Sequence, residues 1–186
     1  VLRDLTFDPA SGRYFLKGPY AEIVDVEPPF TGLHQLDSST FHFTRSQRAF
    51  EAVMCYYHID KSMRYVNDTL GFPLLPLPYA GGVRVDPHGL NGANNAWAMW
   101  DGHIAFGSPP DATDNAEEAC TILHELFHLM HDWVTAYGAS QVEGLGDGCA
   151  DYWGQSYSRS YHYFSPSDQQ YNWWSVWGGL PNGSTP

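Results

Sequence analysis

Hydrophobic and polar residues alternate in two short stretches near the start of the chain. These stretches, residues 13–17 and 21–26, are separated by Gly18-Pro19, and Pro28-Pro29 follows the second one. Alternation with a period of two is typical of a strand with one face in the core, and Gly and Pro are common in the turns between strands. We therefore expect residues 1–43 to form an N-terminal segment of short strands.

The next segment has hydrophobic residues at helical spacing. Between Thr44 and Asn67 the chain contains neither Pro nor Gly, whereas Gly71 and Pro73 follow closely. Apolar residues three or four positions apart lie on one face of a helix, so the pattern predicts a long helix that packs on one side and ends before Gly71. The apolar residues at this spacing are Ala49, Val53, Tyr56, Tyr57, Met63 and Val66.

Two strands and two helices are predicted beyond this helix. The strands are residues 82–85 and 103–106, within a region rich in Gly, Pro and Asn. One helix should begin at Asp114, whose side chain can cap it, and end at Gly138. A shorter helix should begin near Gln141 and continue through Tyr152 or beyond.

The composition indicates a folded, exported protein that does not bind nucleic acid. Hydrophobic residues make up 43% of the 186 positions and aromatic residues 16%, enough apolar surface for a core. The net charge of −12 would repel phosphate backbones and anionic lipid, and no apolar run approaches the roughly 20 residues of a membrane span. The lack of an initiator Met and the sequons at Asn67 and Asn182 favour an extracellular location after removal of a leader.

The helix predicted over residues 114–138 carries the motif His124-Glu125-Leu126-Phe127-His128. Residues four apart share one face of a helix, about 6 Å apart, so both imidazoles can bind one tetrahedral Zn²⁺. Glu125, one position along, lies beside the open coordination position. A carboxylate there can act as general base toward water whose pKa zinc lowers toward about 7. The motif therefore predicts a hydrolytic zinc site.

A third zinc ligand is expected in the segment Glu143-Gly144-Leu145-Gly146-Asp147. Glu143 can supply a carboxylate oxygen, and Asp147, one helical turn later, can accept a hydrogen bond from a ligand imidazole. His131 is a competing ligand, but about 10 Å of helix rise separates it from His124, too far for one metal to hold all three histidines. We expect zinc on His124, His128 and Glu143, with His131 beside the site or on the surface.

These motifs resemble those of the gluzincin metallopeptidases, specifically the thermolysin and fungalysin families and their secreted bacterial and archaeal relatives. The match rests on the motif at 124–128 and on the segment 143–147. Asn94-Asn95-Ala96-Trp97 is similar to the Asn-Ala edge strand of these families, and residues 50–72 resemble the long helix that precedes it in fungalysin-like enzymes. The resemblance covers about residues 40–155.

The resemblance implies an α+β zincin fold, with a twisted sheet, a long packing helix and an active-site helix, and the activity of a secreted zinc endopeptidase. One zinc per chain would lie on the three ligands named above. Glu125 would be the general base, and Asp147 would orient His124. Asn95 and Ala96 would bind the substrate backbone, through a side-chain amide and an edge-strand carbonyl.

The chain departs from these families in the residue that stabilises the oxyanion. Only 14 residues separate His128 from Glu143, fewer than in thermolysin, so Tyr137 matches the oxyanion-stabilising tyrosine only loosely. We expect the helical lobe that carries a further histidine to be absent. Tyr157 and His162 are the substitutes expected for the catalytic donor.

We expect one catalytic domain over residues 1–186, with segments 1–43, 44–112 and 113–186, acting on a peptide or protein. Two other functions stay open. One is a peptidase-fold subunit of a larger extracellular assembly without catalysis, which the missing lobe and the aromatic residues Trp173, Trp174 and Trp177 favour. The other is a non-proteolytic zinc hydrolase. Calcium could bind the loop carboxylates Asp101, Asp111 and Asp114.

The three cysteines allow one disulfide. If the third ligand and Asp147 both reach the zinc helix, the following helix must run antiparallel to it, which brings Cys149 near Cys120. We expect a Cys120–Cys149 disulfide that braces the site, with Cys55 free. The alternative is three small buried side chains, as is common for free cysteine.

Overall fold

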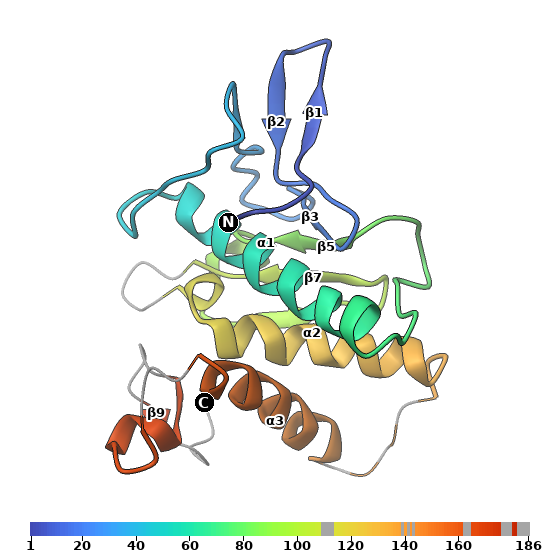
Figure 1. The fold of residues 1–186 in the computed structure, drawn as a ribbon, viewed down its shortest axis with the longest axis vertical. Coiled ribbons are helices and arrows are strands. Elements are labelled where there is room, and N and C mark those ends of the chain that lie inside the picture. Colours follow the sequence, from blue (N-terminus) through green and yellow to red (C-terminus); the bar gives the residue numbers. More distant parts are fainter. Residues whose placement is uncertain are drawn as a thin grey trace.

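The computed structural model describes residues 1–108, 114–138, 140, 142, 144–161, 165–175 and 180–181. Within these residues the fold is α+β, with three α-helices and both parallel and antiparallel strand pairs (Figure 1). The α+β class is therefore the one expected from the sequence.

The central sheet has four strands in the order β3-β5-β7-β6. The first three are mutually parallel, and β6 lies antiparallel to β7 at one edge. Val83, Val85, Ile104 and Phe106 lie on one face of β5 and β7 and are fully buried, as a strand face that packs against helices requires. The strands are β3 (Ala21–Ile23), β5 (Val83–Asp86), β6 (Ala96–Ala98) and β7 (His103–Phe106).

A smaller antiparallel sheet, in the order β1-β2-β4, projects from one end of the molecule (Figure 1). It consists of β1 (Thr6–Asp8), β2 (Arg13–Phe15) and β4 (Gln35–Leu36). Near the other end of the chain, β8 (Trp173–Ser175) and β9 (Leu180–Pro181) form a hairpin after a 3₁₀ turn at Gln169–Asn172.

Helices α1 (Ala49–Arg64) and α2 (Ala119–Val134) lie side by side along the central sheet, and α3 (Leu145–Arg159) packs against α2 (Figure 1). The chain after α1 continues as a π-helical turn, Tyr65–Thr69. Short 3₁₀ turns at Leu90–Gly92 and Asn115–Glu117 precede β6 and α2. Helix α1 contacts β3 and β5, and α2 contacts β7 and β6. This order brings α2 next to β6, the edge strand of the sheet among the described residues.

The strands and helices lie close to their predicted positions. Strands β2, β3 and β7 fall within predicted stretches, and β5 extends one residue beyond the stretch predicted at residues 82–85. The predicted helix from Asp114 begins with a 3₁₀ turn that the Asp114 side chain caps by accepting a hydrogen bond from the N–H of Ala116. In α1 and the turn after it, Ala49, Tyr56, Met63 and Val66 are buried, whereas Val53 and Tyr57 are half-buried.

The expected Cys120–Cys149 disulfide is wrong, because all three cysteines are free. Helix α3 does run antiparallel to α2, but Cys120 lies against Gly154 and Ser158, with its Sγ 3.0 Å from the Ser158 Oγ. The pairing of the two helices is shifted by about one turn from the expected one. Cys149 lies two residues, or about 200° around the helix, from Asp147, so it is not on the face of α3 that carries Asp147.

Within the described ranges, no helix is both long and apolar enough to cross a bilayer.

Candidate metal centre

Helices α2 and α3 together form a cluster of potential metal ligands. His124 and His128 are four residues apart and lie on the same face of α2, the face that packs against α3. The left-handed Gly144, with φ of 73°, precedes α3. Asp147 then lies in the first turn of α3, directly opposite the two histidines.

Three ligand atoms converge in this cluster. The Nε2 atoms of His124 and His128 are 3.1 Å apart, and Oδ1 of Asp147 is 3.8 Å from the first and 3.4 Å from the second. Ligands at about 2.0–2.1 Å from a tetrahedral zinc ion lie about 3.3 Å from one another. The three separations scatter around this value, so the ligand atoms fit one small tetrahedral cation with a fourth position open.

Asp151 holds His124 in the orientation that the cluster needs. Its Oδ1 is 2.9 Å from Nδ1 of His124, so it accepts the Nδ1–H and leaves the lone pair of Nε2 directed at the cluster. The sequence predicted this role for Asp147. In the structure Asp151 lies beside Nδ1 of His124, and Asp147 lies beside Nε2. The residue that orients His124 is thus one helical turn later in α3 than the sequence predicted.

The second histidine is kept in its neutral form. Burial and the neighbouring His124 lower the pKa of His128, while the charges of Asp147 and Asp132 act in the opposite direction. Neutral imidazole is the form that binds metal ions.

Glu125 lies beside the cluster, with 8% of its surface exposed. The backbone N–H of Ala98 in β6 donates a hydrogen bond to its carboxylate. Burial raises the pKa of Glu125 to about 7, the hydrogen bond from Ala98 lowers it, and the charge of Asp147 raises it. A carboxylate with a pKa in this range can both accept and return a proton at neutral pH.

The edge strand presents backbone groups toward the same region. The N–H of Met99 donates to the carbonyl of His103 in β7, and the carbonyl of Asn95 accepts from the N–H of Gly107 just after β7. In an antiparallel ladder Ala96 and Ala98 therefore direct their N–H and C=O groups outward. The outward N–H of Ala96 bonds to the Asn95 side chain at 2.9 Å. The carbonyls of Ala96 and Ala98 are thus placed for a strand added at this edge.

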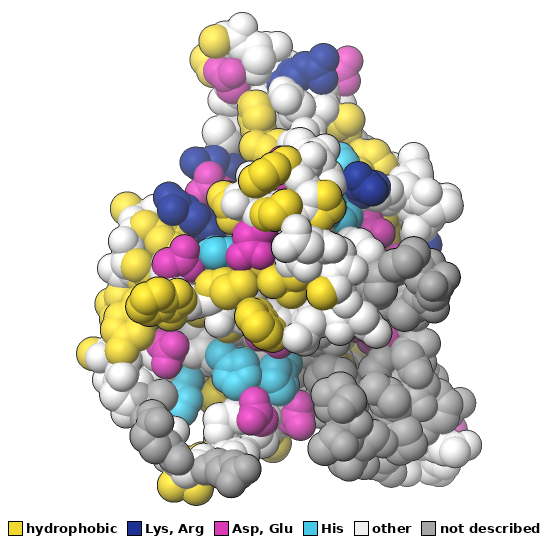
Figure 2. Space-filling view, turned by 180° about the vertical axis from the view of Figure 1, so that it is seen from behind, with side chains coloured by type: hydrophobic (Ala, Val, Ile, Leu, Met, Phe, Trp, Pro, Cys, Tyr) yellow, Lys and Arg dark blue, Asp and Glu magenta, His cyan; other side chains and the backbone are white. Residues whose placement is uncertain are grey.

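Figure 2 shows the face that carries the histidines. A group of histidine side chains lies at the surface with acidic side chains beside it and a band of hydrophobic side chains along one side. The exposed apolar residues of the β6–β7 hairpin include Trp97 and Trp100.

Tyr157 lies away from the metal centre. It is ten residues beyond Asp147 on the same helix, which corresponds to about 15 Å of rise. Its hydroxyl is 2.9 Å from Nδ1 of His58 in α1 and 2.7 Å from the hydroxyl of Tyr161. The structure thus gives Tyr157 packing and hydrogen-bonding partners at the α1–α3 contact, and the expected catalytic role does not fit this position.

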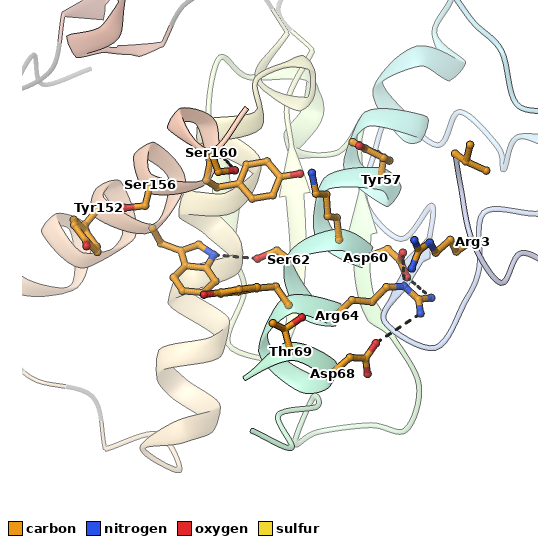
Figure 3. Close-up of a pocket in the computed structure, with 15 residues that line it drawn as sticks. Arg3, Tyr57, Asp60, Ser62, Arg64, Asp68, Thr69, Tyr152, Ser156 and Ser160 are labelled. Atoms are coloured by element: carbon orange, nitrogen blue, oxygen red, sulfur yellow. Dashed lines mark hydrogen bonds and ion pairs between the residues drawn. The ribbon is translucent and has the colours of Figure 1, made fainter. Parts of the chain in front are cut away.

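A cavity of about 890 Å³ lies at this contact between α1 and α3 (Figure 3). Arg64 is held there by Asp60, at 2.8 Å, and Trp153 donates its indole N–H to the Ser62 hydroxyl at 3.0 Å. The residues that line the cavity also include Tyr57, Tyr152 and Tyr157. None of the three metal-ligand candidates lines it.

The other predicted site residues lie either outside the described residues or outside the ligand cluster. Glu143, His162 and Asp111 lie outside the described residues. Tyr137 is exposed in the turn after α2, and His131 is half-buried against the ring of Phe127. Neither belongs to the ligand cluster.

Two of the acidic residues considered for calcium have protein partners. Asp101 accepts from the His103 ring at 2.6 Å, and Asp114 caps the N–H of Ala116. Among the described residues, the one group of three or more potential ligands that lie close together is His124, His128 and Asp147.

Sequence reasoning missed Asp151 and Ala98. Asp151 had a usable signal, because it lies four residues after Asp147 and so shares its face of α3. The part played by Ala98 is made by its backbone N–H, and which N–H groups of a strand point outward depends on strand register.

No protein-family model matches the chain, and a search of curated proteins found no match. The function therefore has to be argued from the site itself.

Proposed function

We propose that the chain is a zinc-dependent endopeptidase with a zincin fold, acting outside the cell. The observation that supports this most directly is the set of separations among the Nε2 atoms of His124 and His128 and Oδ1 of Asp147, 3.1, 3.4 and 3.8 Å. Two imidazoles and one carboxylate are a ligand set typical of catalytic zinc, because a fourth position stays open.

Each residue of the site has a separate role in this proposal. Zinc, when bound, polarises the carbonyl of the substrate and lowers the pKa of water at the open position. Glu125 takes one proton from the attacking water and later gives it to the leaving amine. Asp151 keeps the Nε2 lone pair of His124 available, and Ala98 fixes the Glu125 carboxylate through its N–H.

The substrate would lie along the edge of the sheet. The outward carbonyls of Ala96 and Ala98 can accept hydrogen bonds from the N–H groups of an extended peptide. Glu125 is bonded to the same strand, so a peptide bound there passes close to the general base. This arrangement suits hydrolysis within a chain.

The proposal is tested by removing and restoring the metal. The protein is incubated with a mixed peptide library before chelation, after chelation and gel filtration, and after addition of one equivalent of Zn²⁺, and the products are identified by mass spectrometry. We expect cleavage in the first and third samples and none in the second. Cleavage that persists in the metal-free sample, or a zinc-loaded chain that cleaves nothing, would contradict the proposal.

A further inference from the structure

Acidic and basic residues are distributed unevenly along the chain. Residues 85–158 contain eleven of the 21 acidic residues but neither Lys nor Arg, so all nine basic residues lie outside this segment. The segment comprises β6, β7, α2 and all of α3 except its last residue, Arg159. It therefore includes every residue described above as building the metal centre.

Several of these carboxylates lie around the two histidines. The side chains of Asp147 and Asp151 are 70% and 46% exposed. Asp132 lies on α2, one turn after His128, and its charge acts on the pKa of that histidine. These three carboxylates carry three negative charges, and a single Zn²⁺ would offset only two of them. The rim of the site therefore stays negative with the metal bound.

Two of the basic residues, Arg64 and Arg45, form ion pairs away from the two histidines. Arg64 is paired with Asp4 and Asp60, 2.6 and 2.8 Å away, at the α1–α3 cavity. Arg45 reaches the acidic segment through an ion pair with Glu117, before the start of α2. On the face in Figure 2, the Lys and Arg side chains drawn in colour lie away from the largest group of histidines. Nearby cations thus do little to balance the rim.

We infer that the substrates are basic, namely peptides with Lys or Arg side chains close to the bond that is cleaved. This inference rests on the proposed function. A cleft lined by charges of one sign raises the local concentration and association rate of ligands of the opposite sign. Zinc and a general base act on any peptide bond, whereas the carboxylates select among peptides by charge. An acidic peptide would be repelled.

Three peptides test the inference. They share one core sequence with blocked ends and differ only at two positions on each side of the cleaved bond, where they carry Lys, Gln or Glu. We expect kcat/KM for the Lys peptide to exceed that for the Gln peptide by about tenfold or more at low salt, with the Glu peptide slowest. The three values should converge at about 0.5 M salt, because salt screens the charges.

Two substitutions at Asp132 locate the effect. Asp132→Asn should lower kcat/KM for the Lys peptide about two- to fivefold at low salt, and Asp132→Lys should lower it further. The effect is measured as the ratio of kcat/KM for the Lys peptide to that for the Gln peptide, because any general effect of Asp132 through His128 acts on both peptides alike. Asp37→Asn is the matched control, since it removes the same charge from an exposed position after β4, and it should change none of the three values.

A binding measurement separates this inference from the proposed function. Fluorescence anisotropy gives the affinity of labelled Lys, Gln and Glu peptides for the zinc-loaded Glu125→Gln variant, which needs no turnover. Chelator-sensitive cleavage with no dependence on peptide charge would overturn the inference and leave the function intact. Tighter binding of the Lys peptide without cleavage by the wild type would overturn the function and leave only the selection of basic peptides by the acidic rim. Equal binding of the three peptides would overturn the inference.

Discussion

At the scale of single residues, three carboxylates in similar positions have different tasks. Asp147 is directed at the Nε2 atoms of both histidines, Asp151 accepts from Nδ1 of His124, and Glu125 is bonded to the backbone of β6. Their surroundings set these roles: Glu125 is buried, whereas Asp147 is exposed and free to approach a cation. Substitution of each of these three residues should therefore change the zinc affinity by a different amount.

Substitutions at these positions should separate metal ligands from supporting residues. Asp147→Asn should weaken zinc binding by more than about 100-fold, and Asp151→Asn by about 10- to 100-fold, the range for residues that orient a ligand. Glu125→Gln should leave the zinc affinity unchanged. Competition with a chromophoric chelator measures all three affinities.

Glu143→Gln is the decisive comparison for the third ligand. If Asp147 is the ligand, Glu143→Gln should leave zinc affinity within about tenfold of the wild type. A greater loss for Glu143→Gln than for Asp147→Asn would assign the third ligand to Glu143, as the sequence motif predicted.

A buried glutamate outside the site should make stability depend on pH. Burial raises the pKa of Glu51 to about 7; Asp114 and Glu117 act in the same direction, and its own N–H and Arg48 oppose it. The folded protein therefore holds a proton that the unfolded chain releases near pH 4.5, and stability falls as the pH rises from about 4.5 to 7. Oε2 of Glu51 is buried with no hydrogen-bond partner in the described structure.

Glu51→Gln should abolish the fall in stability between about pH 4.5 and 7. The variant should be more stable than the wild type by about 1–2 kcal/mol at pH 8, with allowance for solvent screening, and should show little difference at pH 4.5. Urea unfolding at the two pH values measures it. The same difference at both pH values would show that ionisation of Glu51 is not the cause.

At the scale of secondary-structure elements, the geometry of the candidate metal centre depends on how closely α3 packs against α2. Gly154 makes this contact: a Cβ there would lie 2.8 Å from the carbonyl oxygen of Cys120 and 3.3 Å from its Cα. Both neighbours are backbone atoms of α2, which cannot move aside. The distance between the helices, and so the positions of Asp147 and Asp151, is set by this glycine.

Gly154→Ala should therefore lower both stability and zinc affinity. Pushing α3 away should cost about 1–3 kcal/mol of folding free energy and should separate Asp147 and Asp151 from the histidines. Gly148→Ala is the matched control on the same helix, because no atom lies within 4 Å of its added Cβ, and it should stabilise the protein by about 0.5–1 kcal/mol. If both variants bind zinc as the wild type does, helix spacing does not control the site.

The same helix pairing predicts three reactive thiols after unfolding. With no disulfide, alkylation of the denatured, unreduced protein should modify all of Cys55, Cys120 and Cys149. In the native protein Cys149 should react first, because it is half-buried and the other two are buried. Mass spectrometry counts the modifications, and a single modified thiol would restore the expected disulfide.

At the scale of the whole molecule, the sequence predicted elements better than their contacts. Local patterns located α1, α2 and the strands β2, β3, β5 and β7, because hydrophobic periodicity is a property of neighbouring residues. The pairing of α3 with α2 was expected one turn away from its observed position, since many residues of the two helices contribute to that register. This shift explains the roles assigned to Asp147, the overlooked Asp151 and the wrong disulfide.

In the candidate site, too, residues within one element could be predicted from the sequence, whereas contacts between elements could not. The histidines and Glu125 follow from spacing within one helix, so they could be found in the sequence. The link between Glu125 and Ala98 joins a helix to a strand 27 positions earlier in the chain, and no local pattern encodes it. Tyr157 was expected at the site from its residue type, whereas the face of α3 on which it lies directs it to α1.

Among the described residues, the fold brings the candidate metal ligands of α2, the edge strand β6 and an acidic rim together on one face. The central proposal is that this face hydrolyses peptides. The most direct test compares turnover of one peptide by the wild type and by Glu125→Gln, both loaded with one zinc per chain. We predict that the variant keeps its zinc and loses at least about 100-fold in kcat, because proton transfer by a positioned side chain contributes at least that much. A zinc-loaded Glu125→Gln variant with undiminished turnover would contradict the account.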